Sequence, residues 1–371
     1  MVQRARNSAF TASILAILAL AAPSVRAADP APSAPGPLAS DAAGCGGRLA
    51  GQRIRWIISS GPGSAYDVPA RLIGPHFAER LGAESVFENR SGASGLVGYK
   101  ATKAAVAEGD VVINVLSGAQ TLIGAAHGRL PDPVTGMHLL GQIAGSRYVW
   151  ATGKDSPFAT LDDVFATARE RPIVFAVFEP KGSAFTRIVG MNETLGLDAT
   201  YVTGYKRSPQ IAMAAIRQEV DVIAIGLSGQ ESLFENGDLR PLMTLNGGIG
   251  AFGMDALPTF AGPDGVVMAR ARALGRDLDD AAAEAAAITA FSEIGRIVAV
   301  PMGVDPTLIP CLRATLEATF ASPEFRRDAE ATGRPMDTLS AEATEALIER
   351  ARARLETLKR VADAAAARLS Q

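Results

Sequence analysis

Short apolar runs alternate with helical patterns along most of the chain. The first run, residues 54–58, has the length and the flanking turn residues of a buried parallel strand. A glycine-rich turn at residues 59–66 follows it, and Asp67 is placed to cap a helix whose apolar stripe runs from Ile73 to Leu81. The pattern therefore predicts a strand, a glycine-rich turn and a helix, in that order.

This unit repeats, with a turn rich in glycine or serine after most of the strands. Further strands are predicted at residues 85–88, 111–116, 173–178, 199–202 and 220–225. Because strands that alternate with helices form parallel sheets covered on both faces, the fold class is α/β. A second series of units starts after Trp150, which predicts two lobes, each with a parallel-rich sheet flanked by helices. We expect residues 239–245 to form a strand that returns to the first lobe, and the Ala-rich stretches 280–288 and 341–369 to form surface helices.

The first 51 residues are interpreted as segments that precede the folded protein. Two arginines come before an apolar run at residues 9–22, and Val25-Arg26-Ala27 has the small-x-small pattern that signal peptidase reads. Residues 1–27 are therefore predicted to be a cleaved signal peptide, which places the protein in the periplasm. Residues 28–51 are rich in Ala, Pro, Ser and Gly and are predicted to form a flexible linker.

Length and composition bound the architecture and exclude some partners. The 371 residues exceed the usual size of a single hydrophobic core, which again favours two lobes. We expect the first part of lobe 1 at residues 52–147, lobe 2 at 148–240, and the return segment and C-terminal helices of lobe 1 at 241–371. The net charge of −3 has no strong sign, so it favours neither nucleic acid nor an anionic membrane as a partner.

Histidines and cysteines are few. His76, His127 and His138 are the only histidines and none stands at the spacing of a zinc site, so we expect neither a metal nor a cofactor. Cys45 and Cys311 are the only cysteines. An exported protein meets an oxidising compartment in which a single disulfide persists, and the sequence leaves open whether these two cysteines pair.

The turns after the strands are the places where a ligand is expected. In open parallel sheets, ligands bind outside the carboxyl ends of the strands, where the amides of helix N-termini favour anions. Glycine lets the backbone approach a ligand closely, and hydroxyl groups donate further hydrogen bonds from Ser64, Ser117, Ser183 and Ser228. The sequence therefore favours a small carboxylate as the ligand.

Several residues in these turns have a structural interpretation as well. Asp67 fits a helix cap better than a ligand contact, and Tyr66 fits either a buried aromatic or the lining of a cleft. Lys181 and Arg207 are interpreted as surface charges, with the alternative that either one complements a second carboxylate of the ligand. Arg147, next to the predicted hinge, fits an ion pair between the lobes and a plain surface position equally well.

Enzyme motifs are incomplete in this chain. Gly226-Leu227-Ser228-Gly229 matches half of a nucleophile elbow, but Gln230 occupies the place of the glycine that must follow. The histidines have no triad arrangement, and Gly61-Pro62-Gly63 lacks the third glycine of a dinucleotide fingerprint. We therefore expect no enzymatic activity; the alternative from this class is a periplasmic serine hydrolase that uses Ser117 or Ser228.

A series of motifs runs in one order from about residue 53 to residue 304. They are Gly63-Ser64-Ala65-Tyr66-Asp67, Glu88-Asn89-Arg90-Ser91-Gly92-Ala93-Ser94-Gly95, Val202-Thr203-Gly204-Tyr205-Lys206-Arg207-Ser208, Arg217-Gln218-Glu219-Val220-Asp221, Gly295-Arg296 and Val300-Pro301-Met302-Gly303-Val304. In these motifs the chain resembles the Bug family, the substrate-binding proteins of tripartite tricarboxylate transporters. The resemblance implies a type II periplasmic binding protein, a Venus-flytrap whose interlobe cleft holds a carboxylate through amides and hydroxyls of both lobes.

The same resemblance implies where the ligand binds and who receives it. The expected ligand-binding residues are Gly63, Ser64, Ala65, Tyr66, Asp67, Ser117, Gly118, Ala119, Gln120, Gly182, Ser183, Ala184, Tyr205 and Ser228. Ser64-Ala65 replace two glycines that are usual in the family's first loop, and in Lys206-Arg207-Ser208 an arginine takes the place of the family's usual glycine and adds positive charge. Both departures leave the identity of the ligand open. The implied function is that of a monomeric receptor that passes a small organic anion to membrane transporter subunits. The alternative is an orphan receptor that feeds a sensor kinase.

Overall fold

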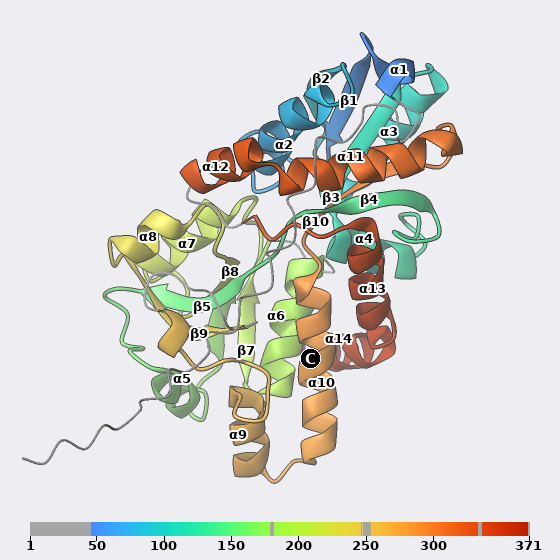
Figure 1. Ribbon diagram of the computed structural model, residues 1–371. Coiled ribbons are helices and arrows are strands. Elements are labelled where there is room, and N and C mark those ends of the chain that lie inside the picture. The colour runs from blue at the N-terminus through green and yellow to red at the C-terminus, as the bar shows by residue number, and fades with distance from the viewer. Residues whose placement is uncertain (1–45, 179–181, 246, 248–253, 333–335, 370–371) are drawn as a thin grey trace, which may run out of the picture. The chain divides into compact units, whose positions relative to one another are not determined.

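The computed structural model describes residues 46–178, 182–245, 247, 254–332 and 336–369 (Figure 1). Contacts divide the chain into Met1–Leu38 and Ala39–Gln371, and every described element belongs to the second unit. The predicted signal peptide and most of the predicted linker lie outside the described residues, so both stay predictions.

The strands of the described chain form three sheets. Their bounds are β1 (Arg53–Ile58), β2 (Glu84–Asn89), β3 (Val111–Ser117), β4 (Met137–Ala144), β5 (Tyr148–Gly153), β6 (Ile173–Ala176), β7 (Ala199–Val202), β8 (Ile223–Gly226), β9 (Leu239–Thr244) and β10 (Arg296–Pro301). The first sheet has the order β2-β1-β3-β10-β4, the second has the order β8-β5-β9, and the third is the pair β6-β7. β1, β2 and β3 run parallel, as do β6 and β7, whereas β10 and β5 are antiparallel to their neighbours. The predicted α/β class is confirmed.

Helices connect most of these strands and pack on the sheets. They are α1 (Gly46–Leu49), α2 (Asp67–Glu79), α3 (Leu96–Ala107), α4 (Gly118–Ala126), α5 (Leu161–Thr167), α6 (Ser183–Thr194), α7 (Ser208–Ile216), α8 (Glu231–Glu235), α9 (Val266–Leu274), α10 (Leu278–Glu293), α11 (Ile309–Ala321), α12 (Pro323–Ala331), α13 (Ala341–Arg352) and α14 (Leu355–Leu369), with short 3-10 turns at Ala93–Gly95, Met254–Ala256 and Pro306–Leu308. α2 packs on β1 and β2 beside α11 and α12, whereas α3 packs on β1 and β3 (Figure 1).

Burial explains the pattern of apolar residues in β1 and α2. Ile54, Trp56 and Ile57 of β1 are fully buried, because a central parallel strand is covered on both faces. On α2, Ile73 and Phe77 are fully buried as the predicted stripe requires. The Trp56 and Phe77 rings meet edge to face, with their centroids 5.6 Å apart. This contact locks α2 to β1 and thereby fixes the loop that joins them.

One predicted strand pairs in a different sheet from the one expected. Residues 239–245 were expected to return to the first lobe, but β9 pairs antiparallel with β5 in the second sheet. The chain returns to the first sheet only at β10. A strand of six residues with mixed apolar and polar positions fits the edge of either sheet, so the pattern alone does not select the partner. The predicted lobe boundary at residue 240 falls inside β9, and the division into lobes stays a prediction.

The Ala-rich stretch 280–288 is helical, but it is not the surface helix that was expected. It belongs to α10, which packs against α6, α9, α13 and α14 and buries Ala281, Ala285, Ile288 and Phe291. Small side chains let helices approach closely, and alanine content does not show which face is covered. The second Ala-rich stretch divides into α13 and α14, and α14 packs against α6.

Candidate functional site

A pocket of about 1070 Å³ lies among the loops that follow the strands. The loops after β1, β2 and β3 contribute to its lining, and so do the loops after β6, β7 and β8. These are the carboxyl ends of the strands, where α/β sheets bind their ligands. The volume is sufficient for a small organic molecule together with water.

Most of the residues predicted to bind a ligand line this pocket. They are Gly63, Ser64, Ala65, Tyr66, Ser117, Gln120, Gly182, Ser183, Ala184, Tyr205 and Ser228. Asp67, Gly118 and Ala119 are buried beside it and are not part of the lining. The sequence therefore located the loops, whereas the position of each side chain within a loop depends on local packing.

Asp67 anchors the first loop from behind. Its carboxylate accepts hydrogen bonds from the Gly63 amide at 2.8 Å, from Asn89 Nδ2 at 2.9 Å and from Arg71 Nε at 2.8 Å. Burial opposes ionisation of Asp67, but these hydrogen bonds outweigh it and hold the pKa of the carboxyl below its usual value. Asp67 is not the helix cap that was predicted: it is the first residue of α2, and Tyr66 before it makes no side-chain cap hydrogen bond. Instead, Ser64 Oγ accepts from the amide of Asp67 at 3.3 Å. Asp67 thus holds the loop in shape while Ser64 and Tyr66 face the pocket.

Of the four residues predicted at the start of α4, Ser117 and Gln120 line the pocket, whereas Gly118 and Ala119 do not. The contacts of the first helical turn explain this difference. Ser117 caps the helix, because its Oγ accepts from the Gln120 amide at 3.2 Å. Gly118 faces β10: a Cβ on this residue would lie 2.3 Å from Ile294 Cγ2. Ala119 is buried in the core. Gly118 therefore allows close packing between α4 and the start of β10, and it has no contact with the pocket.

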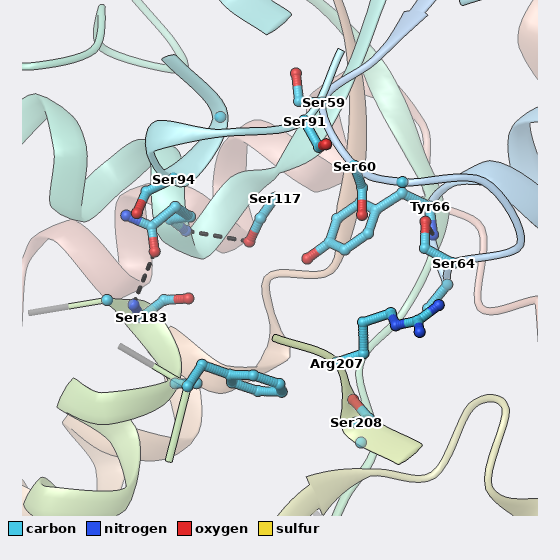
Figure 2. A pocket seen from close by; sticks show the side chains of 18 of the residues that line it. Ser59, Ser60, Ser64, Tyr66, Ser91, Ser94, Ser117, Ser183, Arg207 and Ser208 are labelled. Atoms are coloured by element: carbon cyan, nitrogen blue, oxygen red, sulfur yellow. Dashed lines mark hydrogen bonds between the residues drawn. The ribbon is translucent and has the colours of Figure 1, made fainter. Parts of the chain in front are cut away.

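Gln120 and Ser183 join the two sets of loops. The Ser183 amide, at the N-terminus of α6, donates to Gln120 Oε1 at 2.8 Å (Figure 2). An amide oxygen thereby occupies one of the free N–H groups of the helix end, which are the groups that bind anions in many proteins. A carboxylate oxygen is a stronger acceptor for the same amide.

The loop after β2 has an unusual backbone where it borders the pocket. Gly92 to Gly95 all have positive φ, and the two residues between the glycines, Ala93 and Ser94, have φ of 46° and 54°. A left-handed conformation is costly for residues with a Cβ, and such residues concentrate at functional sites. The sequence motif 88–95 marked this loop, but no residue of it was predicted to bind the ligand.

Two buried arginines in the lining were not predicted either. Arg187 of α6 is 3% exposed and Arg296, the first residue of β10, is 8% exposed. Arginine is rarely buried, so composition and pattern favour the surface for both. One signal was present: Arg187 follows Ser183 by four residues, which places both on the same face of the helix.

Positive charge is concentrated in this pocket. Its lining contains Arg187, Lys206, Arg207 and Arg296, and none of the lining residues that the structure describes is Asp or Glu. The whole chain, by contrast, has a net charge of −3. Arg207 reaches toward the loop of Ser64 and Tyr66, and serine hydroxyls from several loops surround the same space (Figure 2). Such a lining attracts anions.

The other candidate residues have mixed outcomes. Arg147 forms an ion pair with Asp337, with Nη2 to Oδ1 at 2.8 Å and Nε to Oδ2 at 3.0 Å, so the plain surface position is wrong. Cys311 is buried and disulfide-bonded. Cys45, whose pairing with Cys311 the sequence left open, lies outside the described residues, and so does Lys181, whose predicted roles stay predictions.

Within the described ranges, no group of three or more His, Cys, Asp or Glu side chains is arranged to hold a metal ion. None of the helices among these residues has the length and the apolar content needed to cross a membrane.

Comparison with known proteins gives a consistent result. Residues 70–259 match the model of the tripartite tricarboxylate transporter family receptor. A UPF0065 protein of Bordetella bronchiseptica is 24% identical over 192 residues, which are 51% of this chain and 56% of that protein. The matched region thus spans little more than half the length of this curated relative.

Solved structures match over a longer stretch. The periplasmic binding protein BugD has a TM-score of 0.62 at 15% identity, covering 84% of this chain and 97% of BugD. An R. palustris protein solved with adipate has a TM-score of 0.62 at 20% identity, with 84% of this chain and 97% of that chain covered. At these identities the likeness establishes a fold of the periplasmic binding protein type.

Proposed function

The chain belongs to the Bug, or TctC, family of tripartite tricarboxylate transporter receptors, and on this premise we propose that it captures a small carboxylate in the pocket described above. The protein acts in the periplasm, as a receptor and not as an enzyme. It delivers the anion to membrane subunits of a transporter of this type. Residues 52–147 and 148–240 belong to the two lobes that close on the ligand.

The charge of the pocket is the observation that carries this proposal. Four cationic side chains line it, and the described part of the lining holds no acidic residue to neutralise them. The Ser183 amide at the N-terminus of α6 donates to Gln120 Oε1, and it becomes a further donor to the ligand when a carboxylate takes the place of that amide oxygen. These features favour an anion with oxygen acceptors. Adipate, which is bound in the R. palustris protein of similar fold, has this chemistry.

The surroundings of the serines support a receptor over a serine hydrolase. Ser117 and Ser228 line the pocket, but no histidine, aspartate or glutamate is found among the described lining residues that surround them. A serine nucleophile needs an adjacent base to lose its proton. The hydroxyl of Ser117 serves instead as the cap of α4.

Isothermal titration of the purified protein against mono-, di- and tricarboxylates tests the proposal. We expect saturable binding of at least one of these anions. Ser183→Asp places a carboxylate at the N-terminus of α6, inside the pocket, where it competes with the ligand for the same donors. We expect this variant to lose at least about tenfold in affinity, because a charge of the same sign as the ligand costs more than 1.4 kcal/mol at such a site.

The matched control is Ser340→Asp. Ser340 caps α13, where its Oγ accepts from the Ala343 amide at 3.2 Å, and it is not among the pocket residues. Aspartate is an equally good cap, so this variant is expected to bind like the unmodified protein. Absence of binding heat with every anion, or unchanged affinity in Ser183→Asp, contradicts the proposal.

A further inference from the structure

Two cations and two tyrosine rings form one cluster in the pocket. The guanidinium carbon of Arg187 lies 3.5 Å from the centroid of the Tyr148 ring, and that of Arg296 lies 5.5 Å from the centroid of the Tyr66 ring. All four residues line the pocket, although they come from four separate segments: α6, β10, β5 and the loop after β1. We refer to Arg187 and Arg296 as the arginine pair.

The arginine pair has no anionic partner within the described chain. No carboxylate of the described residues lies within salt-bridge distance of either guanidinium, although ion pairs are formed by many other arginines. Nε of Arg187 and Nε of Arg296 are both buried without a hydrogen-bond partner. Arg296 Nη1 donates to Gly145 O and, at 3.3 Å, to Ser146 Oγ. The Nε of each guanidinium therefore lacks an acceptor within the described chain.

The two charges reinforce each other's field. Burial lowers the pKa of Arg187. The hydroxyl groups of Tyr148 and Tyr66 oppose this shift, and the nearby charge of Arg296 adds to it. An arginine stays protonated despite such shifts because its ordinary pKa is above 12. Burial opposes ionisation of Tyr148, but the charges of Arg187 and Arg296 outweigh it and bring the pKa of its hydroxyl below the usual value. The local potential is thus strongly positive.

Buried charges without partners are rare because desolvation is costly, and protein sites that contain them bind an opposite charge. We infer that the arginine pair binds one acidic group of a ligand that has two, and thereby selects dicarboxylates over monocarboxylates. The second acidic group of the ligand is held by the loop amides, which include that of Ser183. A planar guanidinium offers parallel N–H groups that match the two oxygens of a carboxylate.

This inference rests on the proposed function and adds the residues that determine specificity. Its test compares ligands of equal length and different charge: succinate, glutarate and adipate, each beside its own monoamide, in isothermal titration. For the best-bound diacid, we expect the monoamide to bind at least about 30-fold more weakly, the smaller of the effects seen when one partner of a buried charge pair is removed.

Variants of the arginine pair should reduce this ratio. We expect Arg187→Gln and Arg296→Gln each to bring the ratio of the two affinities below about 5-fold, by weakening the diacid more than the monoamide. Arg187→Lys keeps the positive charge but lacks the planar guanidinium with its two parallel donors, so it should give an intermediate ratio. An intermediate ratio in this charge-conserving variant also shows that the glutamine variants do not act through a defect in folding. The control is Arg207→Gln, because Arg207 lines the same pocket from an exposed position and should weaken both ligands alike.

Each outcome decides one question. If monoamides bind as tightly as diacids, or if Arg187→Lys and the glutamine variants keep the full ratio, the inference is wrong and the proposed carboxylate receptor stands. If neither the diacids, the monoamides nor simple monocarboxylates bind, the proposed function is wrong and the inference falls with it. A high ratio of diacid to monoamide affinity that depends on the arginine pair and not on Arg207 supports both the proposed function and this inference.

Discussion

Replacing Arg187 by methionine should make the ligand-free protein more stable. Arg187 is 3% exposed, its Nε has no hydrogen-bond partner, and among the described residues no carboxylate pairs with it. Exchanging buried ions for apolar residues of similar volume commonly stabilises a protein by about 1–4 kcal/mol. The substitution also removes the stacking on Tyr148, which is worth roughly 1–2 kcal/mol for a desolvated cation. A methionine thioether recovers part of that contact with the ring.

The balance is a gain of about 1–2 kcal/mol. For a chain of this length, 1 kcal/mol shifts the midpoint of thermal unfolding by about 1.5 °C. We therefore expect the Tm of the ligand-free Arg187→Met variant to rise by about 2–3 °C in scanning calorimetry. The same variant should bind dicarboxylates poorly, so that stability and binding change in opposite directions.

Arg240 provides the matched control. Its guanidinium donates to three backbone carbonyls, those of Lys154 at 2.8 Å, Phe158 at 3.3 Å and Ser156 at 3.5 Å. Arg240→Met leaves these acceptors without their partner, so we expect a loss of about 1–3 kcal/mol and a lower Tm. If Arg187→Met also lowers the Tm, then Arg187 is satisfied in the free protein and our reasoning about an unpartnered charge is refuted.

Two further predictions concern the loops of the pocket. Although burial opposes ionisation of Asp67, its hydrogen bonds hold the pKa below the ordinary 3.8, so the carboxylate stabilises the fold above about pH 4 and this contribution is lost as the pH falls through the folded-state value. Urea unfolding at several pH values should thus show a steeper loss below about pH 4 in the wild type than in Asp67→Asn, and parallel curves would contradict this. A Cβ at Gly98 would lie 2.2 Å from Ser59 Oγ and 2.9 Å from Ser59 Cα, so Gly98→Ala should cost about 1–3 kcal/mol in urea unfolding. Gly47→Ala, where nothing lies within 4 Å, should cost nothing, and equal stability of the two variants would exclude this contact as the cause.

The sequence predicted most strands because burial on both faces produces short runs dominated by apolar residues, as in β1, where Arg55 is the one polar residue between Ile54 and Ile58. It did not predict their order. β10 lies between β3 and β4, although β4 and β10 are separated along the chain by six helices and five strands of the described structure. No local pattern encodes such a pairing, and the same limit explains why β9 was placed in the wrong sheet.

For the site, the loops were predictable and the buried charges were not. Glycines and serines after strands indicate an anion site through local chemistry, which located Ser64, Ser117 and Ser183. Arg187 and Arg296 come from distant segments, and only the fold brings them beside Tyr148 and Tyr66 in the pocket lining. Asp67 was correctly placed at the start of a helix, but its role depends on Asn89, which arrives from another strand.

The place of β10 in the first sheet has a consequence for how the chain is made. Among the described strands β4 pairs with β10, and a further isolated bridge joins Gln142 to Leu339. Residues 137–144 therefore gain these backbone hydrogen bonds only after residues 296–301 have been made. Pairing across such a sequence distance is slow to nucleate. During synthesis, the sheet stays incomplete until four fifths of the polypeptide has left the ribosome. A chain that delays its own closure in this way stays unfolded for longer, which suits the export that the proposed periplasmic role requires.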